Sequence, residues 1–471
     1  MEQEIKKVSW ITSYKLEDGR LAEMLYDPIK EETSFIVGIN DKTEILEKLE
    51  LKDGKLNLFP LKADSSLLKV GFIKFPSALG KYNTNLELFE EIKAHIQKYS
   101  ILPNNFTTIA ALYVMMTWVY QKFHVLPYLR VVGMHGTGKT RFLETVGNLC
   151  YQALFVGGSA STASIFRAID TFKGSLIFDE ADFRNSELWS EIVKILNSGH
   201  TNDFPVTRME VDPAGNFMIK PFFVFGPKIL ASRIRFGDEA LESRCLSQNL
   251  LPHHTEISAP THLTEEFKKE ALTIRNKLLA FRFLNYNNPV LQEQTLSGIN
   301  FPRLKQSILA IVNIAKLIDK RVEQEVLDFA LDYEKELQMY QTRSMECDVL
   351  ICILKIMLDQ KEMELLKGKI RIQRVAQEYN GRFDDDFDDK ERVHEGLHGA
   401  FVAFNHRVSP RKIGAVVSGK LMIRTERDGD GFFIPVSEYE KINILKGRYG
   451  ITNDMLGIKQ SNDKKAKSIE I

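Results

Sequence analysis

Residues 128–143 read YLRVVGMHGTGKTRFL, an apolar run followed by a glycine-rich turn and then by a segment of helical character. Gly133, Gly138, Lys139 and Thr140 occupy the fixed positions of the pattern G-x-x-x-x-G-K-[ST]. An ordinary glycine-rich turn is the weaker interpretation, because strand, turn and helix occur in the order that the pattern requires. The stretch therefore predicts a strand, a phosphate-binding loop and a helix that begins at the end of the loop.

In a loop of this kind the backbone N–H groups point at phosphate oxygens, and the lysine reaches the β- and γ-phosphates. The helix that follows directs its positive end at the same phosphates. The predicted ligands are ATP and Mg²⁺, with the Thr140 hydroxyl on the metal. The expected ATP-binding residues of the loop are Gly133, Met134, His135, Gly136, Thr137, Gly138, Lys139 and Thr140.

A second segment, GSLIFDEAD at 174–182, is an apolar run that ends in acidic residues, with Asp179 and Glu180 directly after the run. This is the arrangement of a Walker B strand, in which Asp179 would lie at the Mg²⁺ ion and Glu180 would polarise the attacking water. A strand that ends in a solvated acidic turn is the alternative. We expect Glu180 and Lys139 to be catalytic.

Strand-like runs alternate with helical stretches from Val131 to about Leu251, in the order RVVG, ALFVGG, SLIFDEAD and PFFVFGPKILAS. Strands interleaved with helices indicate a parallel sheet with helices on both faces. The predicted fold class is therefore α/β.

The segment FGPKILASRIRFGDEALESRC, 225–245, contains a strand that ends at Ser232, where it can sense the γ-phosphate, and a short acidic helix followed by Arg244. Here the sequence resembles the AAA+ ATPases, in which a Ser-Arg pair supplies an arginine finger to the neighbouring subunit. The resemblance implies that Arg244 is catalytic in trans and that hydrolysis depends on assembly. A surface salt bridge is the alternative role for Arg244.

A hairpin turn at DPAG, 212–215, precedes the sensor strand and resembles the pore hairpin of MCM-type helicases. The segment INFPRLKQSILAIVNIAK, 299–316, is similar to the part of that family in which an arginine after proline is the second sensor of ATP, here Arg303. The resemblance implies DNA contacts for Arg208 and Lys220, which flank the turn. Either residue can instead be structural.

The resemblance covers approximately Tyr128 to Ile318 and is closest to the MCM-like self-loading helicases and replication initiators of phages and of staphylococcal cassette-chromosome and pathogenicity-island elements. It implies a P-loop AAA+ core with a helical lid, assembled as a hexameric ring that moves along DNA. The chain departs from MCM proteins at 157–174, which is too short for their extra hairpin.

The C-terminal stretch SPRKIGAVVSGKLMIRTERDGDGFFIPV, 409–436, begins with Ser and Pro at helix-start positions and continues into two strands around Asp428 to Gly431. A helix followed by a β-ribbon is the plan of a winged helix. DNA contacts are expected from Arg411, Lys412, Lys420, Arg424 and Arg427. The alternative is a winged helix that contacts only protein.

The whole chain is expected to contain a small β-rich N-terminal module with turns at Asp18-Gly19 and Asp53-Gly54, and a buried helix over the apolar run 109–120. The predicted divisions are a β-rich module at 1–76, a helical collar at 77–127, the ATPase core at 128–254, the lid at 255–344, the winged helix at 345–450 and a basic tail at 451–471.

The composition excludes several classes of protein. Lys+Arg and Asp+Glu balance at 63 each, which disfavours a uniformly basic coat for nucleic acid or membrane. The run 109–120 is shorter than the roughly 20 residues that span a bilayer, so no membrane partner is expected. The scattered cysteines Cys150, Cys245, Cys347 and Cys352 disfavour zinc and disulfides and fit a reducing cytoplasm, as does an N-terminus without a signal peptide.

The phosphate-loop and acidic motifs predict an ATPase, and the resemblance implies an ATP-dependent DNA helicase and replication initiator of a mobile element or phage, acting as a homo-oligomer, likened to a hexamer, with DNA and replication proteins as partners. An ATP-dependent DNA-binding regulator and a protein-remodelling ATPase are the two rival functions. Strand displacement distinguishes the helicase from both.

Overall fold

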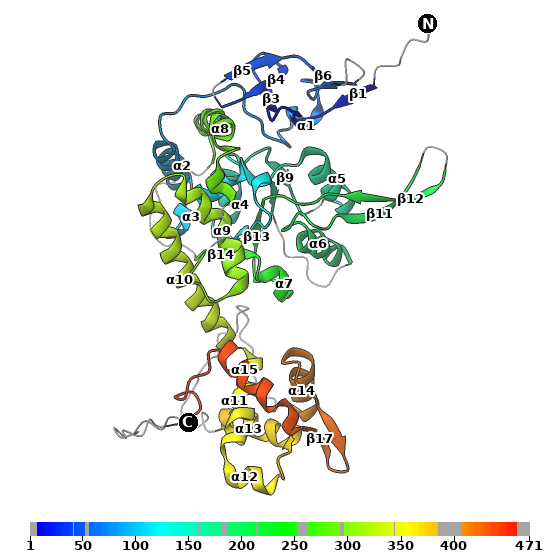
Figure 1. The fold of residues 1–471 in the computed structure, drawn as a ribbon, viewed down its shortest axis with the longest axis vertical. Helices are drawn as coiled ribbons and strands as arrows, with labels where there is room; N and C mark the ends of the chain where they lie inside the picture. Colours follow the sequence, from blue (N-terminus) through cyan, green and yellow to red (C-terminus); the bar gives the residue numbers. More distant parts are fainter. Residues whose placement is uncertain are drawn as a thin grey trace. The chain divides into compact units, whose positions relative to one another are not determined.

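The computed structural model describes residues 7–40, 42–51, 56–158, 160–179, 187–212, 215–251, 262–292, 296–342, 344–384 and 407–458. The chain divides into two compact units, Met1–Leu331 and Asp332–Ile471 (Figure 1). Among the helices of the described residues, none is both long and apolar enough to cross a membrane.

A five-stranded parallel sheet forms the centre of the first unit, in the order β14-β8-β13-β10-β9. Its strands are β8 (Tyr128–Val132), β9 (Leu154–Val156), β10 (Leu176–Phe178), β13 (Lys228–Ser232) and β14 (Cys245–Asn249). The parallel sheet predicted from the sequence is thus present. Strands covered on both faces are mostly apolar, which explains the apolar runs that predicted them, although the fully buried Arg130 of β8 and Lys228 of β13 are exceptions.

Helices cover both faces of this sheet (Figure 1). One face carries α5 (Thr162–Phe172), α6 (Glu187–Ser198) and α7 (Glu239–Glu242), and the other carries α3 (Asn104–Thr117) and α4 (Lys139–Gly147). Alternate residues of β10 pack against the two helical layers. Leu176 and Phe178 share a buried cluster with residues of α5 and α6, whereas Ile177 lies against Gly147 of α4. A Cβ atom at Gly147 would lie 3.0 Å from Ile177, so glycine allows the close approach of helix and sheet.

The N-terminal part contains two smaller sheets. The first consists of β1 (Lys7–Trp10), β7 (Leu56–Phe59) and β6 (Leu49–Leu51), and the second is an antiparallel meander of β2 (Ser13–Lys15), β3 (Leu21–Asp27), β4 (Glu32–Ile39) and β5 (Lys42–Leu46). Gly19, in the predicted turn between β2 and β3, has a φ of 87°, which favours glycine. The predicted turn at Asp53-Gly54 lies outside the described residues, between β6 and β7. The short helix α1 (Ser66–Lys69) follows.

A buried ion pair fastens these sheets to the helices. Arg282 donates through Nε to the Glu23 carboxylate at 2.7 Å, and both side chains are almost fully buried. Glu23 also accepts from the Tyr151 hydroxyl at 2.7 Å. Because Glu23 lies in β3 and Tyr151 follows α4, the N-terminal sheets and the parallel sheet share one polar network in their common interior.

The remaining helices of the first unit are α2 (Asn85–Tyr99), α8 (Glu265–Asn285) and α9 (Pro302–Lys316), with 3-10 turns at Tyr120–Lys122 and Pro289–Gln292; α10 (Lys320–Thr342) begins in this unit. Residues 109–116 of α3 are completely buried, which confirms the prediction of a buried helix. Helix α8 was predicted as part of a lid. Its Arg275 donates to the carbonyl oxygens of Phe75, which precedes α2, and of Asn148, which ends α4. These two contacts anchor α8 to both segments.

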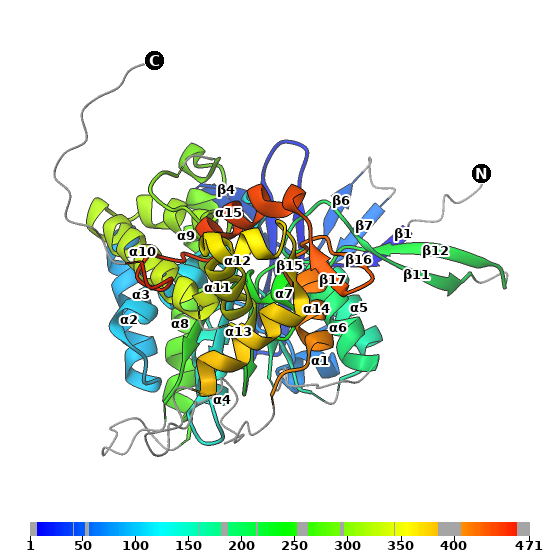
Figure 2. The same cartoon turned by 90° about the horizontal axis from the view of Figure 1, so that it is seen from below.

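The hairpin predicted before the sensor strand is formed by β11 (Val206–Val211) and β12 (Phe217–Phe222). Arg208 pairs with Lys220 across the ladder, and Met209 pairs with Ile219. The hairpin projects from the first unit in both views (Figures 1 and 2). Residues 213–214 of its turn lie outside the described residues.

The second unit is built from helices and a small antiparallel sheet. The helices are α11 (Met345–Leu358), α12 (Gln360–Leu365), α13 (Ile372–Asp384), α14 (Pro410–Ala415) and α15 (Tyr439–Arg448), with a π-helical turn at Val416–Lys420 and a 3-10 turn at Val436–Glu438. The sheet has the order β15 (Ile370–Arg371), β17 (Gly431–Ile434), β16 (Glu426–Asp428). Ser409 caps α14 by accepting from the Lys412 N–H, as the Ser-Pro pair predicted. The basic tail falls mostly at 459–471, outside the described residues.

Candidate nucleotide-binding site

The carboxyl ends of β8, β13 and β10 bring three predicted segments to one edge of the parallel sheet. Strand β13 lies between β8 and β10. The glycine-rich loop follows β8, Ser232 ends β13, and Asp179 follows β10. Ligands of parallel α/β folds bind at this edge, because loops and helix N-termini converge there.

Glycine is required in the loop for two different reasons. Gly133 donates its N–H to the Ser232 carbonyl at 3.1 Å, and a Cβ atom at Gly133 would lie 2.6 Å from the Thr137 hydroxyl. Gly138 has a φ of 87° and forms the N-cap of α4. A side chain at the first position would displace the loop, and one at the second would strain the backbone that directs α4 at the site.

Lys139 extends back across its own loop. Its ammonium group donates to the carbonyl oxygens of Gly133 and Met134, both at 2.7 Å. The charge is therefore held at the mouth of the loop, where phosphate oxygens would be stronger, charge-assisted acceptors.

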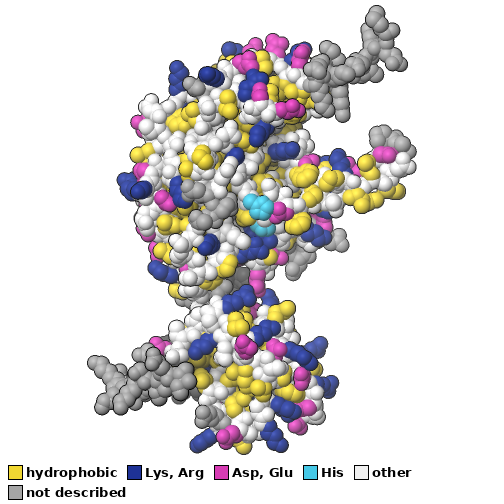
Figure 3. All heavy atoms as spheres, viewed as in Figure 1, with side chains coloured by type: hydrophobic (Ala, Val, Ile, Leu, Met, Phe, Trp, Pro, Cys, Tyr) yellow, Lys and Arg dark blue, Asp and Glu magenta, His cyan; other side chains and the backbone are white. Residues whose placement is uncertain are grey.

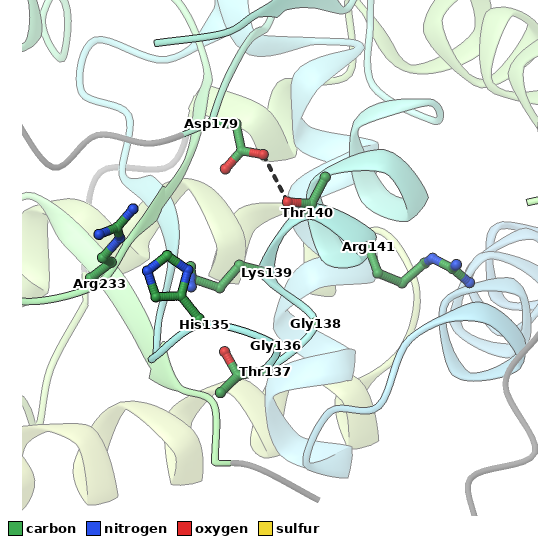
Figure 4. Close-up of a pocket in the computed structure, with 9 residues that line it drawn as sticks. All are labelled: His135, Gly136, Thr137, Gly138, Lys139, Thr140, Arg141, Asp179 and Arg233. Carbon is green, nitrogen blue, oxygen red and sulfur yellow. Dashed lines mark hydrogen bonds between the residues drawn. The ribbon is translucent and has the colours of Figure 1, made fainter. Parts of the chain in front are cut away.

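Thr140 and Asp179 meet beside the loop. The Thr140 hydroxyl donates to Oδ2 of Asp179 at 2.8 Å (Figure 4). The separation is that of an ordinary hydrogen bond, and the two groups are oxygen ligands of the kind that Mg²⁺ prefers. The described residues contain no group of three or more His, Cys, Asp or Glu side chains that could hold a metal. A pair of protein oxygens suits Mg²⁺, which keeps waters and takes substrate phosphates as its other ligands.

The cavity at this edge has a volume of about 360 Å³. Three cations, Lys139, Arg141 and Arg233, and one carboxylate, Asp179, contribute to its wall (Figure 4). This charge balance favours an anionic ligand. His135, Gly136, Thr137, Gly138 and Thr140 complete the lining.

Two of these residues, Arg141 and Arg233, were absent from the sequence prediction. Arg233 directly follows Ser232, so the end of the predicted sensor strand was the signal that could have found it. Ser232 itself is fully buried, and its hydroxyl has no hydrogen-bond partner among the described residues. The structure thus presents Arg233, and not Ser232, at the cavity wall. Glu180 lies outside the described residues, directly after Asp179.

Arg244 lies at the opposite edge of the sheet. The next residue, Cys245, pairs with Tyr128 at the beginning of β8, whereas the glycine-rich loop follows Val132 at its end. Arg244 is half-buried, and its Nη1 donates to the Asn197 side-chain oxygen in α6. Burial is the main cause that lowers the pKa of Arg244. Its own nucleotide loop is therefore out of reach, at the far end of the strands.

Arg303, predicted to bind ATP, lies near Arg244. It is exposed in the first turn of α9 and donates to Gln306 at 3.4 Å. Burial, the charge of Arg244 and the smaller effect of Arg303 together lower the pKa of His200 to about 4. The charges of Arg303 and Arg244 thus both act on His200.

The two hairpin cations are engaged in ion pairs. Arg208 contacts Glu191 of α6 at 2.5 Å, and Lys220 contacts Glu210 at 3.0 Å. Arg167 of α5 also contacts Glu210, at 2.9 Å. These pairs attach the hairpin to α5 and α6.

The basic residues predicted to bind DNA in the second unit are more exposed to solvent than Arg208 of the hairpin. Arg411 and Lys412 are exposed on α14 and have no ion pair within the described part of the chain. Arg424 pairs with Glu426 at 3.3 Å, and Arg427 lies over the Phe432 ring at 5.5 Å. Lys420 is exposed at the end of the π-helical turn.

No family model and no curated protein matches this chain. Several solved structures are similar to it, of which three are described here. The SCCmec type IV Cch active helicase is 13% identical with a TM-score of 0.40, over 90% of this chain and 95% of that chain. The NrS-1 C-terminal region is 12% identical with a TM-score of 0.32, over 88% and 96%. The JCV helicase is 13% identical with a TM-score of 0.25, over 54% and 62%. At these values the roles of individual residues depend on the geometry described above.

Proposed function

We propose that this chain is an ATP-dependent DNA helicase and replication initiator of the AAA+ class that acts as a ring-shaped homo-oligomer. One observation carries the proposal. The loop, Asp179 and Arg233 lie at one edge of the parallel sheet, whereas Arg244 and Arg303 lie near the opposite edge. A complete set of phosphate-binding cations would therefore form only between two copies of the chain.

Within one copy, the loop 133–140 would bind the phosphates of ATP, with Lys139 on the β- and γ-phosphates. Thr140 and Asp179 would hold Mg²⁺, which when bound neutralises charge that develops on the phosphates. Glu180 is proposed to orient and polarise the attacking water. Arg233 would contact the same phosphates from the end of β13.

Between copies, Arg244 and Arg303 would contact the γ-phosphate of the neighbour. The two guanidinium groups repel each other in the isolated chain, as the effect of Arg303 on the pKa of Arg244 indicates. A phosphoryl group bound near both would replace this repulsion with two attractions. The neighbour's transition state, with its spread of negative charge, would benefit most.

DNA binding is proposed for the second unit and for the hairpin. Helices α11, α13 and α14 with the strand order β15-β17-β16 support the winged-helix interpretation. Arg411 and Lys412 on α14 have the exposure that phosphate and base contacts require. Arg208 and Lys220 would first have to exchange Glu191 and Glu210 for phosphates.

Unwinding of forked DNA tests the proposal. The wild-type chain with ATP and Mg²⁺ should displace a strand, and Lys139→Ala should abolish both hydrolysis and displacement. Hydrolysis without displacement on forks of either polarity would refute the helicase. The exposed Arg411 and Lys412 favour a second candidate, an ATP-dependent DNA-binding regulator. A regulator would bind the same forked DNA in a nucleotide-dependent manner without displacing a strand.

The preference for a particular DNA sequence can be measured separately from unwinding. Base contacts are each worth about 1–3 kcal/mol of discrimination, whereas phosphate contacts act evenly on all sequences. Neutralising Arg411 and Lys412 should therefore reduce preference for the origin of the element or phage that encodes the chain. Neutralising Arg424 and Arg427 should mainly reduce the salt dependence of binding. An origin preference unchanged by the first pair would assign the second unit to protein contacts.

A further inference from the structure

An arginine lies inside the parallel sheet, in the strand that leads into the glycine-rich loop. Arg130 is the middle residue of β8, and its side chain is completely buried. Other charged side chains are spread over the visible surface of both units, where water solvates them (Figure 3). A charge inside a sheet is costly unless a counter-ion and hydrogen bonds satisfy it. The position of Arg130 therefore calls for a carboxylate nearby.

Glu242, the last residue of α7, supplies that carboxylate. Arg130 donates through Nη2 to Oε1 of Glu242 at 2.5 Å, and through Nε to the hydroxyl of Ser247 in β14 at 3.0 Å. The Glu242 side chain is 19% exposed, so the pair is shielded from most of the solvent. The end of α7 is thus fixed against the strand that carries the glycine-rich loop.

The same carboxylate holds the segment that follows β13. Nη1 of Arg235 donates to Oε1 of Glu242 at 3.3 Å, and the N–H of Phe236 donates to Oε2 at 2.9 Å. The Phe236 ring in turn covers the Arg130 guanidinium, with 4.4 Å between the ring centroid and Cζ. One carboxylate therefore joins three segments: β8, the residues after β13 and the end of α7.

The residues that Glu242 joins lie between two cations of the proposed mechanism. Arg233, at the cavity wall, is two residues before Arg235. Arg244 is two residues after Glu242, with one residue between them. A displacement of the end of α7 would therefore reach the backbone of Arg244 directly.

An ion pair that only stabilises the fold is the alternative role. Buried ion pairs are weak evidence of stabilisation, since apolar side chains of similar size are often as stable in both positions. The contacts of Glu242 exceed those of a single counter-ion, because one oxygen accepts from two guanidinium groups and the other from a backbone N–H. Such a fixed geometry suits a catalytic group, for which a misplacement of about 1 Å can cost roughly 10² in rate.

We propose that Glu242 is a positioning residue that fixes the end of α7 and thereby holds Arg244 where it acts on nucleotide bound by a neighbouring copy. This inference rests on the proposed function, in which Arg244 acts in trans. Glu242 is not among the residues that line the cavity, so it would act through Arg244 and not on phosphate. Asn197, which accepts from Arg244, would hold the side chain, and Glu242 would hold the backbone before it.

A matched pair of substitutions in α7 tests this role. Glu242→Gln keeps the size of the side chain and removes its charge, whereas Glu239→Gln removes the same charge from an exposed position of the same helix. Glu242→Gln should lower kcat by about 10²-fold with little change in the KM for ATP, and Glu239→Gln should match wild type. A wild-type kcat for Glu242→Gln, or an equal loss for Glu239→Gln, would overturn the proposal.

A second variant separates positioning from folding. Glu242→Gln removes a counter-charge from the buried Arg130, which costs stability. The double variant Arg130→Met, Glu242→Gln removes the buried charge as well, and its urea midpoint should return toward that of wild type. It still lacks the carboxylate, so its kcat should stay low. A double variant that regains both the midpoint and the kcat of wild type would overturn the proposal in favour of a stabilising ion pair.

Combination with other substitutions shows whether Glu242 acts through Arg244. The double variant Glu242→Gln, Arg244→Ala should hydrolyse ATP no more slowly than Arg244→Ala alone, because the group that Glu242 positions is already absent. Mixing Glu242→Gln with Lys139→Ala should restore part of the activity, since the Lys139→Ala copy supplies an intact Arg244. A further loss in the double variant, or no restoration on mixing, would assign Glu242 to its own nucleotide site and overturn the proposal.

These outcomes also separate this inference from the proposed function. If Arg244→Ala is slow and is restored by mixing with Lys139→Ala, but Glu242→Gln behaves like wild type, only the role of Glu242 is wrong. If Arg244→Ala hydrolyses ATP at the wild-type rate, the trans mechanism is wrong and the role of Glu242 is wrong with it.

Discussion

Arg303 lies close enough to Arg244 for its charge to lower the pKa of the Arg244 guanidinium, in addition to the larger effect of burial. Arg244 precedes β14 and Arg303 begins α9, so two distant segments of the chain deliver cations to the same surface. Like charges near each other raise the free energy of the isolated chain unless an anion binds between them. Under the proposed function, the anion is the γ-phosphate bound by a neighbouring copy.

The first prediction concerns the trans role of Arg244. Arg244→Ala should bind ATP with unchanged affinity but hydrolyse it more slowly, because an arginine finger contributes on the order of 10³ to 10⁵ in kcat. Steady-state hydrolysis and nucleotide binding measure the two effects. Mixing Arg244→Ala with Lys139→Ala should restore part of the activity at mixed interfaces. Absence of any restoration would argue that Arg244 acts within its own copy.

Asn197 is predicted to orient Arg244. Its side-chain oxygen accepts from Arg244, and its amide donates to Asp238 at 3.4 Å, so it bridges α6 to the cap of α7. Asn197→Ala should lower kcat by about 10²-fold, the cost of a misplaced catalytic group, with little change in KM. Asn197→Asp keeps the acceptor and should retain more activity. Equal kcat for wild type and Asn197→Ala would remove this role.

The Mg²⁺ site proposed at Thr140 and Asp179 predicts a specific Mg²⁺ dependence. Thr140→Val keeps the shape of the side chain but removes the hydroxyl that contacts Asp179, whereas Thr140→Ser keeps it. A lost contact to a charged group costs about 1.5–3 kcal/mol, so Thr140→Val should need roughly ten to a hundred times more Mg²⁺ for half-maximal hydrolysis. Titration of hydrolysis with Mg²⁺ compares the variants. Identical curves would place the metal elsewhere.

The buried pair Glu23 and Arg282 is predicted to control stability. Removing one partner leaves a charge buried without its counter-ion, so Glu23→Ala should cost about 3–5 kcal/mol of unfolding free energy. Glu266 makes an exposed pair with Lys98, and Glu266→Ala should cost less than about 1 kcal/mol. Urea unfolding measures both. A small loss for Glu23→Ala would mean that the N-terminal sheets are held mainly by apolar contacts.

Two buried histidines predict a loss of stability in mild acid. Burial lowers the pKa of His95 to about 4, and burial with the charge of Arg244 does the same for His200. The unfolded chain therefore takes up protons first, near pH 6.5, and stability falls as the pH drops from about 6.5 to 4, by up to about 1.4 kcal/mol per pH unit for each histidine. His95→Gln should show a shallower decline than wild type in urea unfolding across this range. Parallel declines would show that His95 is protonated in the folded chain.

Local patterns in the sequence were sufficient to predict several parts of the fold. The spacing of Gly133, Gly138 and Lys139 predicted the loop, and the apolar runs around it predicted the parallel sheet, because backbone freedom and burial on both faces restrict which residues can occupy such positions. The hydrogen bond between Thr140 and Asp179 also agrees with the sequence motifs, since the carboxyl ends of parallel strands share one edge of the sheet. These features depend on neighbours in the chain or on strand direction alone.

The tertiary structure decided which partner each charged side chain found. An arginine has the same sequence signature whether it meets a phosphate or a carboxylate, so the pairing of Arg208 with Glu191 and the exposure of Arg233 in the cavity could not be inferred from spacing. The proximity of Arg303 to Arg244 has the same origin. Side-chain charge acts through space over several ångströms, and only the packing of helices on the sheet determines which distant residues share that space.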